Sequence, residues 1–471
     1  MRNRTLAAFA PLLFALAACG GTSTTGGANP SNPSNPTEDG GVPPTPVVPM
    51  AKSSLARDPA SGIAPASLAG AVTANNAFAL DLYSRVRTTA LTSNLLTSPI
   101  SASLALTMTY AGAQGATATQ MASALHFSDS PSTIFDGQNA LSQALASRAA
   151  AALAGDQTTA SNDGQPAPSP SDYQLQVVNS VWGEQTYTWE SPFLDILAKS
   201  YGTGVYQEDF VTQFDQARQT INTWVSSETN DKIVNLLPSG SLDDTTRMVL
   251  VNAIHLKFPW ANPFSVSATA NAPFTTASAT PLVPFMNMTG TFAYTDDGKA
   301  QTVALPLSGN QLSVLITLPH ADLATYEAGL AAGSPAITAP TAQTLVALAL
   351  PKVTFTSASV SLSSALQAMG MTDAFLKTAD FSGLCAHTPD GGTLYISDVL
   401  QKAMIAMQET GVEAAAATAV IVGETSVEGP PPPPPTPMVV NKPFLLSIVD
   451  VPTGAVLFLG HIEDPSDTGS P

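Results

Sequence analysis

Apolar runs, and stretches that alternate apolar and polar residues, predict several β-strands along this chain. Residues 173–182, 312–319 and 348–355 follow strand-like patterns, which indicates strands with at least one face in a core. Residues 248–256 are apolar almost throughout, which is typical of a strand buried on both faces at the centre of a sheet.

Helical patterns are interspersed with these strands. Ser98 and Pro99 fit the N-cap and the first position of a helix that continues to Tyr110. Further helices are predicted over residues 76–83, 137–153, 221–233 and 366–375. Residues 155–171 are rich in polar residues, Pro and Gly, and predict a surface loop. Because the order lacks regular β–α–β spacing, we expect an α+β fold rather than a doubly wound sheet.

The segment from Glu409 to Ser426 can form a strand that is buried on one face. At period two, that face holds only small or β-branched residues: Val412, Ala414, Ala416, Thr418, Val420 and Val422. The opposite face carries Glu413. Six prolines follow at residues 430–435 and cannot lie inside a sheet. The segment therefore predicts a strand able to enter a sheet, joined to an exposed proline-rich connection.

The N-terminal residues predict a targeting signal. Arg2 and Arg4 precede an apolar run over residues 6–18, which is too short to span a bilayer as a permanent helix. Residues 16–20 resemble a bacterial lipoprotein cleavage box, which implies a signal peptide at 1–18 and a lipid on Cys19. The alternative is an ordinary secretory signal with a chance cysteine.

A flexible tether is predicted to follow the signal. Residues 19–70 are rich in Gly, Ser, Thr, Asn and Pro, and hold too few large apolar residues to pack a core. We expect one folded domain at residues 71–466 and a short tail at 467–471. The lipid anchor would make the protein an extracytoplasmic lipoprotein, facing the periplasm or the cell exterior.

Composition excludes some functions. The net charge of −18 leaves no basic patch that could neutralise phosphates, which argues against nucleic-acid binding. Only 11% of the residues are charged, so solubility depends on neutral polar groups and on net negative charge. Apart from Cys19 the only cysteine is Cys385, so the folded domain has no internal disulfide, and we expect Cys385 in the core or a loop.

Three blocks near the C-terminus resemble one family. Glu409-Thr-Gly-Val-Glu413-Ala-Ala-Ala-Ala-Thr418 is followed by Asn441-Lys-Pro-Phe444 and by residues 450–460. In this order they are similar to the hinge, reactive loop and C-terminal strands of the serpins. The resemblance covers most of residues 75–464. It implies a large central sheet with surrounding helices, and an exposed reactive loop at 409–440 that inserts into that sheet as a new strand once a protease has cut it.

The resemblance also implies roles for five residues of the domain. Ser98 and Ser101 match the shutter region below the central sheet, Asn252 falls at the shutter asparagine, and Trp260 at the breach tryptophan. Ordinary core packing would explain each of them alone. Many serpins have a histidine where this chain has Gln401. A glutamine still donates and accepts hydrogen bonds, so we expect the network to hold without a titrating group.

An inhibitory serpin needs a hinge that enters the sheet faster than the acyl-enzyme is hydrolysed. Gly411 would allow the chain to pivot. The inserting arm would then begin with Val412, Glu413, Ala414, Ala415, Ala416, Ala417 and Thr418. Val412 replaces the usual Thr or Ser but is apolar and suits a strand, and no charged residue faces the core. Roughly ten new hydrogen bonds and three buried valines would contribute on the order of 10–20 kcal/mol before entropy is subtracted.

Family spacing places the reactive bond between Thr425 and Ser426, within about two residues. Counting back from Asn441 gives a later bond, inside the proline run. We favour the forward count because the sheet fixes the length of the inserting arm. Residues 412–440 contain no Arg, Lys, Phe, Tyr or Trp, so we expect an elastase-like or subtilisin-like serine protease as the target, or else a papain-like cysteine protease.

Two other functions compete with inhibition. A non-inhibitory serpin would be a binding or structural lipoprotein whose loop is only a protease substrate. An enzyme is disfavoured because the chain has no Gly-x-Ser-x-Gly and its five histidines lack metal-ligand spacing. We expect a monomer that needs neither a cofactor nor a metal and whose partner is a protease.

Overall fold

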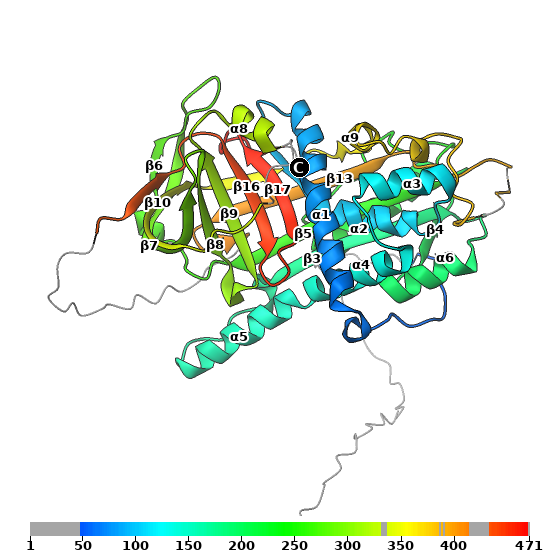
Figure 1. The fold of residues 1–471 in the computed structure, drawn as a ribbon, viewed down its shortest axis with the longest axis horizontal. Coiled ribbons are helices and arrows are strands. Elements are labelled where there is room, and N and C mark those ends of the chain that lie inside the picture. Colours follow the sequence, from blue (N-terminus) through cyan, green and yellow to red (C-terminus); the bar gives the residue numbers. More distant parts are fainter. Residues whose placement is uncertain (1–47, 331–336, 386–387, 390, 414–432, 470–471) are drawn as a thin grey trace, which may run out of the picture. The chain divides into compact units, whose positions relative to one another are not determined.

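The computed structural model describes residues 48–330, 337–385, 388–389, 391–413 and 433–469, which form two β-sheets with helices packed around them (Figure 1). Helices and strands are mixed along the chain without a β–α–β repeat, which confirms the predicted α+β class. None of the helices among these residues combines the length and hydropathy needed to cross a bilayer.

The first sheet, here called the central sheet, has eight strands among the described residues. The order is β1-β4-β3-β5-β14-β13-β11, and β12 also pairs with β13. The strands are β1 (Met50–Ala51), β3 (Gln174–Glu184), β4 (Val205–Glu208), β5 (Met248–Pro259), β11 (Val353–Thr356), β12 (Val360–Ser361), β13 (Val399–Gln408) and β14 (Gly411–Val412). β5 lies in the middle and is buried along almost its whole length, as its apolar sequence predicts.

The second sheet has nine strands in the described part of the chain, in the order β15-β10-β7-β8-β9-β16-β17-β2, with β6 on β7. Its strands are β2 (Leu95–Thr97), β6 (Ala270–Pro273), β7 (Leu282–Asp296), β8 (Ala300–Pro306), β9 (Leu312–Pro319), β10 (Gln343–Pro351), β15 (Thr436–Val439), β16 (Phe444–Asp450) and β17 (Val456–Ile462). β14 and β15 are thus held in different sheets, although only residues 413–435 separate them in sequence.

Helices pack around both sheets, and some of them cover each face of the central sheet. They are α1 (Pro65–Val86), α2 (Pro99–Tyr110), α3 (Gly115–Ala124), α4 (Pro131–Ala146), α5 (Arg148–Asn162), α6 (Ser191–Ile196), α7 (Phe214–Glu228), α8 (Leu323–Leu330) and α9 (Ser363–Ala368). α2, made of small and aliphatic residues, is buried almost throughout and packs against β3 and β5 (Figure 1). α7 packs on the other face, where Ile221 and Trp224 join Val178 and Val251 in one apolar cluster.

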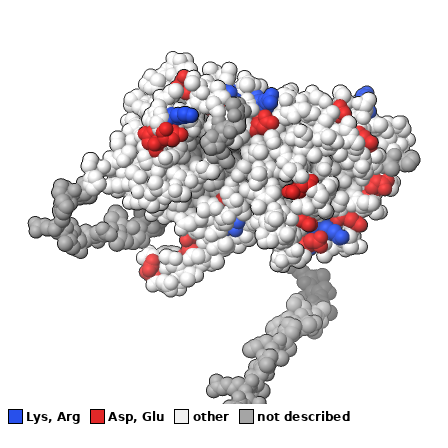
Figure 2. All heavy atoms as spheres, in the orientation of Figure 1, with Lys and Arg blue, Asp and Glu red and all other residues white. Residues whose placement is uncertain are grey.

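The surface agrees with the low charge of the sequence. On the face drawn in Figure 2, Lys and Arg side chains are scattered and do not gather into a patch.

The folded region begins before residue 70, the predicted end of the tether at residues 19–70. β1 pairs with β4 at the edge of the central sheet, and α1 starts at Pro65. Between them, Arg57 donates hydrogen bonds to Asn139 (2.9 Å) and Ser142 (2.5 Å) of α4. The composition did not predict this folded part because the edge strand β1 and the Arg57 side chain bind through hydrogen bonds, which need few apolar residues.

Two other boundaries also differ from the predictions. The tail predicted at 467–471 is attached to the domain, since the Thr356 N–H donates to the Thr468 carbonyl at 3.0 Å and Gly469 bridges to Thr356. The loop predicted at 155–171 is helical as far as Asn162, because α5 is rich in alanine and an exposed Gly155 interrupts it only weakly.

Candidate functional site

The central sheet opens as a fork between β5 and β13. Residues 250–254 of β5 pair in parallel with residues 399–403 of β13. Beyond this stretch β14 lies between them, with Val412 opposite Phe258 on one side and Met407 on the other. β14 therefore occupies the open end of the fork between β5 and β13, as a short strand of two residues.

The hinge turns at Glu413 and not at Gly411. Gly411, the predicted pivot, lies within β14, paired with Pro259 on one side and Gln408 on the other. Glu413 has φ 51°, in the left-handed region that non-glycine residues seldom adopt. Val412 is only 1% exposed and packs with Phe258 and Met407, so its apolar side chain suits the position.

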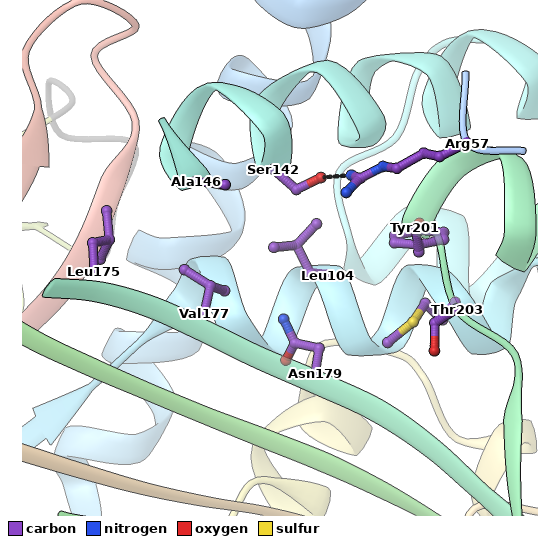
Figure 3. A pocket seen from close by; sticks show the side chains of 10 residues that line it. Arg57, Leu104, Ser142, Ala146, Leu175, Val177, Asn179, Tyr201 and Thr203 are labelled. Carbon is purple, nitrogen blue, oxygen red and sulfur yellow. Dashed lines mark hydrogen bonds between the residues drawn. The ribbon is translucent and has the colours of Figure 1, made fainter. Parts of the chain in front are cut away.

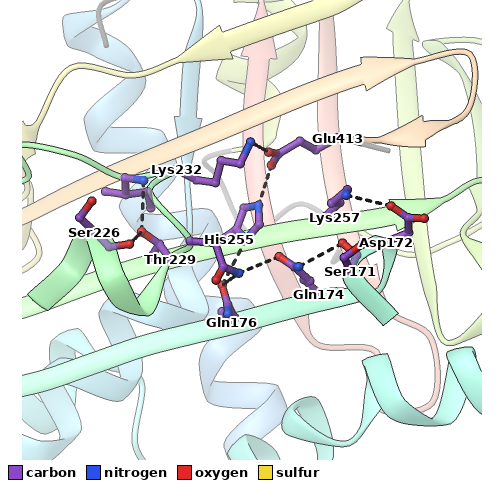
Figure 4. Close-up of polar contacts among 12 residues, drawn as sticks. Ser171, Asp172, Gln174, Gln176, Ser226, Thr229, Lys232, His255, Lys257 and Glu413 are labelled. Atoms are coloured by element: carbon purple, nitrogen blue, oxygen red, sulfur yellow. Dashed lines mark hydrogen bonds and ion pairs between the residues drawn. The ribbon is translucent and has the colours of Figure 1, made fainter. Parts of the chain in front are cut away.

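The Glu413 carboxylate is held by residues of two other elements (Figure 4). Its Oε2 lies 2.6 Å from Nε2 of His255 in β5, and its Oε1 lies 2.5 Å from Nζ of Lys232, which follows α7. Burial raises the pKa of this carboxyl, but the hydrogen bonds from His255 and Lys232 outweigh it, and the pKa lies below the usual value. Glu413 is therefore ionised at neutral pH.

The turn at residues 409–410 is fixed above the fork. The Trp260 N–H donates to the Thr410 carbonyl at 3.0 Å, and Trp260 Nε1 donates to the Gln408 carbonyl at 2.7 Å. The Glu409 carboxylate meets Lys352 Nζ at 2.8 Å and accepts from the Thr269 hydroxyl at 2.8 Å. Trp260 thus holds the end of the fork at which β14 enters.

Below the fork, three amide side chains stand in one row across the sheet. Asn179 of β3, Asn252 of β5 and Gln401 of β13 occupy neighbouring register positions. Gln401 Nε2 donates to Asn252 Oδ1 at 3.0 Å and to the Ser98 carbonyl at 2.8 Å, and Gln401 Oε1 accepts from the Ser98 N–H at 2.9 Å. Gln401 therefore ties the sheet to the start of α2 with both its donors and its acceptor.

The serines at the start of α2 also bond outside their helix. Ser98 precedes α2, but its hydroxyl donates to the Leu457 carbonyl of β17 at 2.9 Å and does not cap the helix as predicted. The Ser101 hydroxyl lies 3.0 Å from the side-chain amide of Asn179. These bonds join α2 to β17 and to the row of amides.

A cavity of about 180 Å³ lies beside this row, between α2, α4 and β3 (Figure 3). Asn179 and Val177 of β3 line it together with Leu104 of α2 and Ser142 of α4. Arg57 reaches Ser142 at its edge. The packing between β3 and the helices is therefore incomplete next to the row of amides formed by Asn179, Asn252 and Gln401.

Family comparison identifies this arrangement. The family model described as "Serpin (serine protease inhibitor)" matches residues 73–465. The chain belongs to the serpin family. Serpins are generally protease inhibitors rather than enzymes, so the partner of such a protein is in general a protease.

Similar serpins come from distant organisms. An uncharacterised serpin-like protein of Thermococcus kodakarensis is 33% identical, over 84% of this chain and 86% of its own. The leukocyte elastase inhibitor of Bos taurus is 32% identical, over 83% and 98%. Among solved structures, human thyroxine-binding globulin superposes with a TM-score of 0.68 at 26% identity, over 85% of this chain and 100% of its own.

Several predicted serpin residues lie outside the described part. These are the candidate reactive bond at Thr425 and Ser426, the inserting-arm residues Ala414, Ala415, Ala416, Ala417 and Thr418, and the lipidation candidate Cys19. Cys385 is described and is buried in the core, as expected. In the described residues no group of three or more His, Cys, Asp or Glu is placed to hold a metal ion.

Sequence reasoning missed His255 and Lys232 as parts of the hinge. His255 gave one signal, since it is a polar residue inside an otherwise apolar strand. Lys232 gave none, because nothing local relates it to residue 413.

Proposed function

We propose that this serpin traps a protease by inserting its cut reactive loop into the fork between β5 and β13. The single observation that carries the proposal is the position of β14. It lies between β5 and β13, where the inserted loop would begin its strand. The protease would have attacked the loop and formed an acyl-enzyme. It would then stay covalently bound to the part of the cut loop that moves into the sheet.

The register of the fork supports insertion along its whole length. Val412 stands opposite Phe258 and Met407. Eight positions further along the loop, residue 420 would stand opposite residues eight positions back on each strand, Leu250 and Val399. These two already pair with each other. A new strand would therefore need β5 and β13 to separate, but not to slide along their axes.

The side chains of the arm suit the positions that this register assigns to them. Ala414 would lie between Leu256 and Ile405, both buried, and Thr418 would join the amide row between Asn252 and Gln401. Small residues fit because both faces of this part of the sheet are covered by helices. A hydroxyl beside two amides would find hydrogen-bond partners.

We place the reactive bond at Thr425–Ser426 and propose an elastase-like or subtilisin-like serine protease as the target, with a papain-like cysteine protease as the alternative. The loop lacks the cationic and aromatic residues that trypsin-like and chymotrypsin-like enzymes need. The similar bovine protein is named as an inhibitor of leukocyte elastase, which agrees with this choice.

The test mixes the purified protein with an elastase-type protease and separates the products on a denaturing gel. A covalent band heavier than the inhibitor, which survives boiling, would support trapping. Mass spectrometry of the released C-terminal fragment would locate the cut. Trapping of trypsin by a cut at residues 425–426 would contradict the assigned target class.

A non-inhibitory role is the second candidate, favoured by the similarity to thyroxine-binding globulin, a protein named for binding a ligand. In that case the gel would show complete conversion to a clipped form and no heavier band.

We further propose that Cys19 carries a lipid and that the protein is anchored outside the cytoplasm. The resemblance of residues 16–20 to a lipoprotein cleavage box supports this. Metabolic labelling with a fatty acid should mark the wild-type protein and not C19A. Equal labelling of both would contradict the anchor.

A further inference from the structure

Glu413 is the last described residue before the loop leaves the sheet, and three groups fix its position. Its backbone N–H donates to the Ala406 carbonyl of β13 at 2.5 Å, so residue 413 still follows the β13 register. Its carboxylate binds Lys232 and His255, which belong to segments on the other side of the fork. His255 is 2% exposed, so its contact with Glu413 lies inside the protein. We call the side chains of Glu413, His255 and Lys232 the Glu413 latch.

The backbone of Glu413 is incompatible with insertion. A strand needs φ near −120° to −140°, so residue 413 must rotate from 51° by roughly 170–190° about its N–Cα bond. This rotation carries the Cβ to the opposite side of that bond. The carboxylate must give up its present contacts with His255 and Lys232 during this rotation, before residue 414 can take its place between β5 and β13.

The other charged and polar groups nearby have partners of their own (Figure 4). His255 Nδ1 lies 3.2 Å from Gln176 Oε1, and Lys257 Nζ lies 2.8 Å from Asp172 Oδ1. Both ring nitrogens of His255 thus lie within hydrogen-bond distance of side-chain oxygens.

We propose that Glu413, His255 and Lys232 position the hinge outside the sheet, and that release of this contact sets the rate at which the loop inserts. The proposal rests on the insertion mechanism proposed above and assigns it a barrier. The pairing has to break while residue 413 rotates, so it adds to the barrier to insertion. It also offsets the strain of a non-glycine residue in the left-handed region.

The test compares the unaltered chain with E413Q, and uses E428Q as a matched control that removes the same charge from the loop beyond the assigned reactive bond. The uncut proteins are held just below their melting temperature, and the fraction converted to a heat-resistant form is followed over time. E413Q should convert about ten-fold faster, whereas E428Q should convert at the rate of the unaltered chain. The melting temperature of loop-cleaved E413Q should match that of the cleaved unaltered chain.

Further variants test the pairing itself. K232Q changes a partly exposed lysine and should speed conversion even if E413Q folds poorly. If Glu413 acts through His255, the double variant E413Q/H255Q should convert no faster than E413Q. Equal rates for E413Q, K232Q and the unaltered chain would overturn the latch. The insertion mechanism would fail separately, if cleavage of the unaltered chain gave no rise in melting temperature.

Discussion

Gln401 shows at the scale of one residue how the central sheet is kept closed. Its side chain uses two donors and one acceptor on Ser98 and Asn252, all of them buried. No group in this set titrates near neutral pH, so the contact does not depend on the protonation of a histidine. The neighbouring strand β5 is joined to β13 at this level by both the backbone ladder and these side chains.

Replacing Gln401 by leucine should therefore destabilise the intact protein. The Ser98 N–H and carbonyl would lose buried partners, so we expect a loss of about 2–3 kcal/mol in the free energy of the first unfolding transition. Urea unfolding followed by fluorescence measures this. Q165L, a similar change at an exposed position, should shift the free energy by less than ~0.5 kcal/mol. A similar effect of both changes would mean that the row of amides contributes nothing specific.

His461 provides the expected pH dependence of stability. It is 1% exposed; its Nδ1 lies 2.8 Å from Glu327 Oε1, and its Nε2 faces the carbonyls of Ala90 and Ser93 at 3.1 Å. Burial lowers the pKa of His461, but Glu327 more than compensates, and the pKa lies above 6.5 in the folded protein. The stabilisation by the protonated ring is thus complete below pH 6.5 and is lost as the pH rises through the folded pKa.

The difference in melting temperature between the unaltered chain and H461Q should accordingly be largest near pH 6 and smaller near pH 9. Thermal unfolding at both values tests this. Each unit by which the pKa is raised corresponds to about 1.4 kcal/mol. A difference that does not change between the two pH values would contradict the assignment of the proton to His461.

Single residues were predictable where their neighbours in sequence determine their environment. The small, apolar character of Val412 was enough to assign it to the buried face. The contacts of Glu413 could not be predicted, because Lys232, His255 and Glu413 come together only through tertiary structure. The same holds for the Ser98 hydroxyl, whose acceptor Leu457 lies 359 residues away.

At the scale of elements, long periodic segments were predicted correctly and short or polar ones were not. β3, β5 and β9 lie where the strand patterns place them, because many consecutive side chains favour the same structure. β1 has two residues and pairs with β4 at an edge, so its own sequence carries almost no signal. The family resemblance, rather than periodicity, placed the hinge beside the central sheet.

The element that most directly tests the function is β14. Changing Val412 to aspartate would put a charge at a position that is 1% exposed, beside Phe258 and Met407. An unpaired carboxylate there costs several kcal/mol in the inserted strand. We expect V412D to yield at least ~10-fold less covalent complex relative to clipped protein, measured by gel densitometry.

V439D is the matched control for this change, because Val439 of β15 is 47% exposed and lies on the other side of the loop. It should leave the ratio of complex to clipped protein unchanged. If V412D trapped the protease as well as V439D does, β14 would not be the start of the strand that inserts.

At the scale of the whole molecule, the chain before and after the loop is held by two different sheets. β14 belongs to the central sheet and β15 pairs in parallel with β10 of the second sheet. While the loop is intact, residues between them connect the two sheets and cannot all enter the fork. Cleavage removes this restriction, since the N-terminal arm can then move without β15.

Cleavage near Thr425 should therefore raise the melting temperature. After the cut, on the order of ten further backbone hydrogen bonds and the burial of small apolar side chains become available without β15 having to leave β10. For a domain of this size we expect a rise of at least ~10 °C. Differential scanning calorimetry of the intact and cleaved proteins measures it, and a chain nicked at residues 163–169, beyond the end of α5, provides the control. A cleaved loop that left the melting temperature unchanged would show that the intact chain is already in its most stable form, and trapping by insertion would then have no driving force.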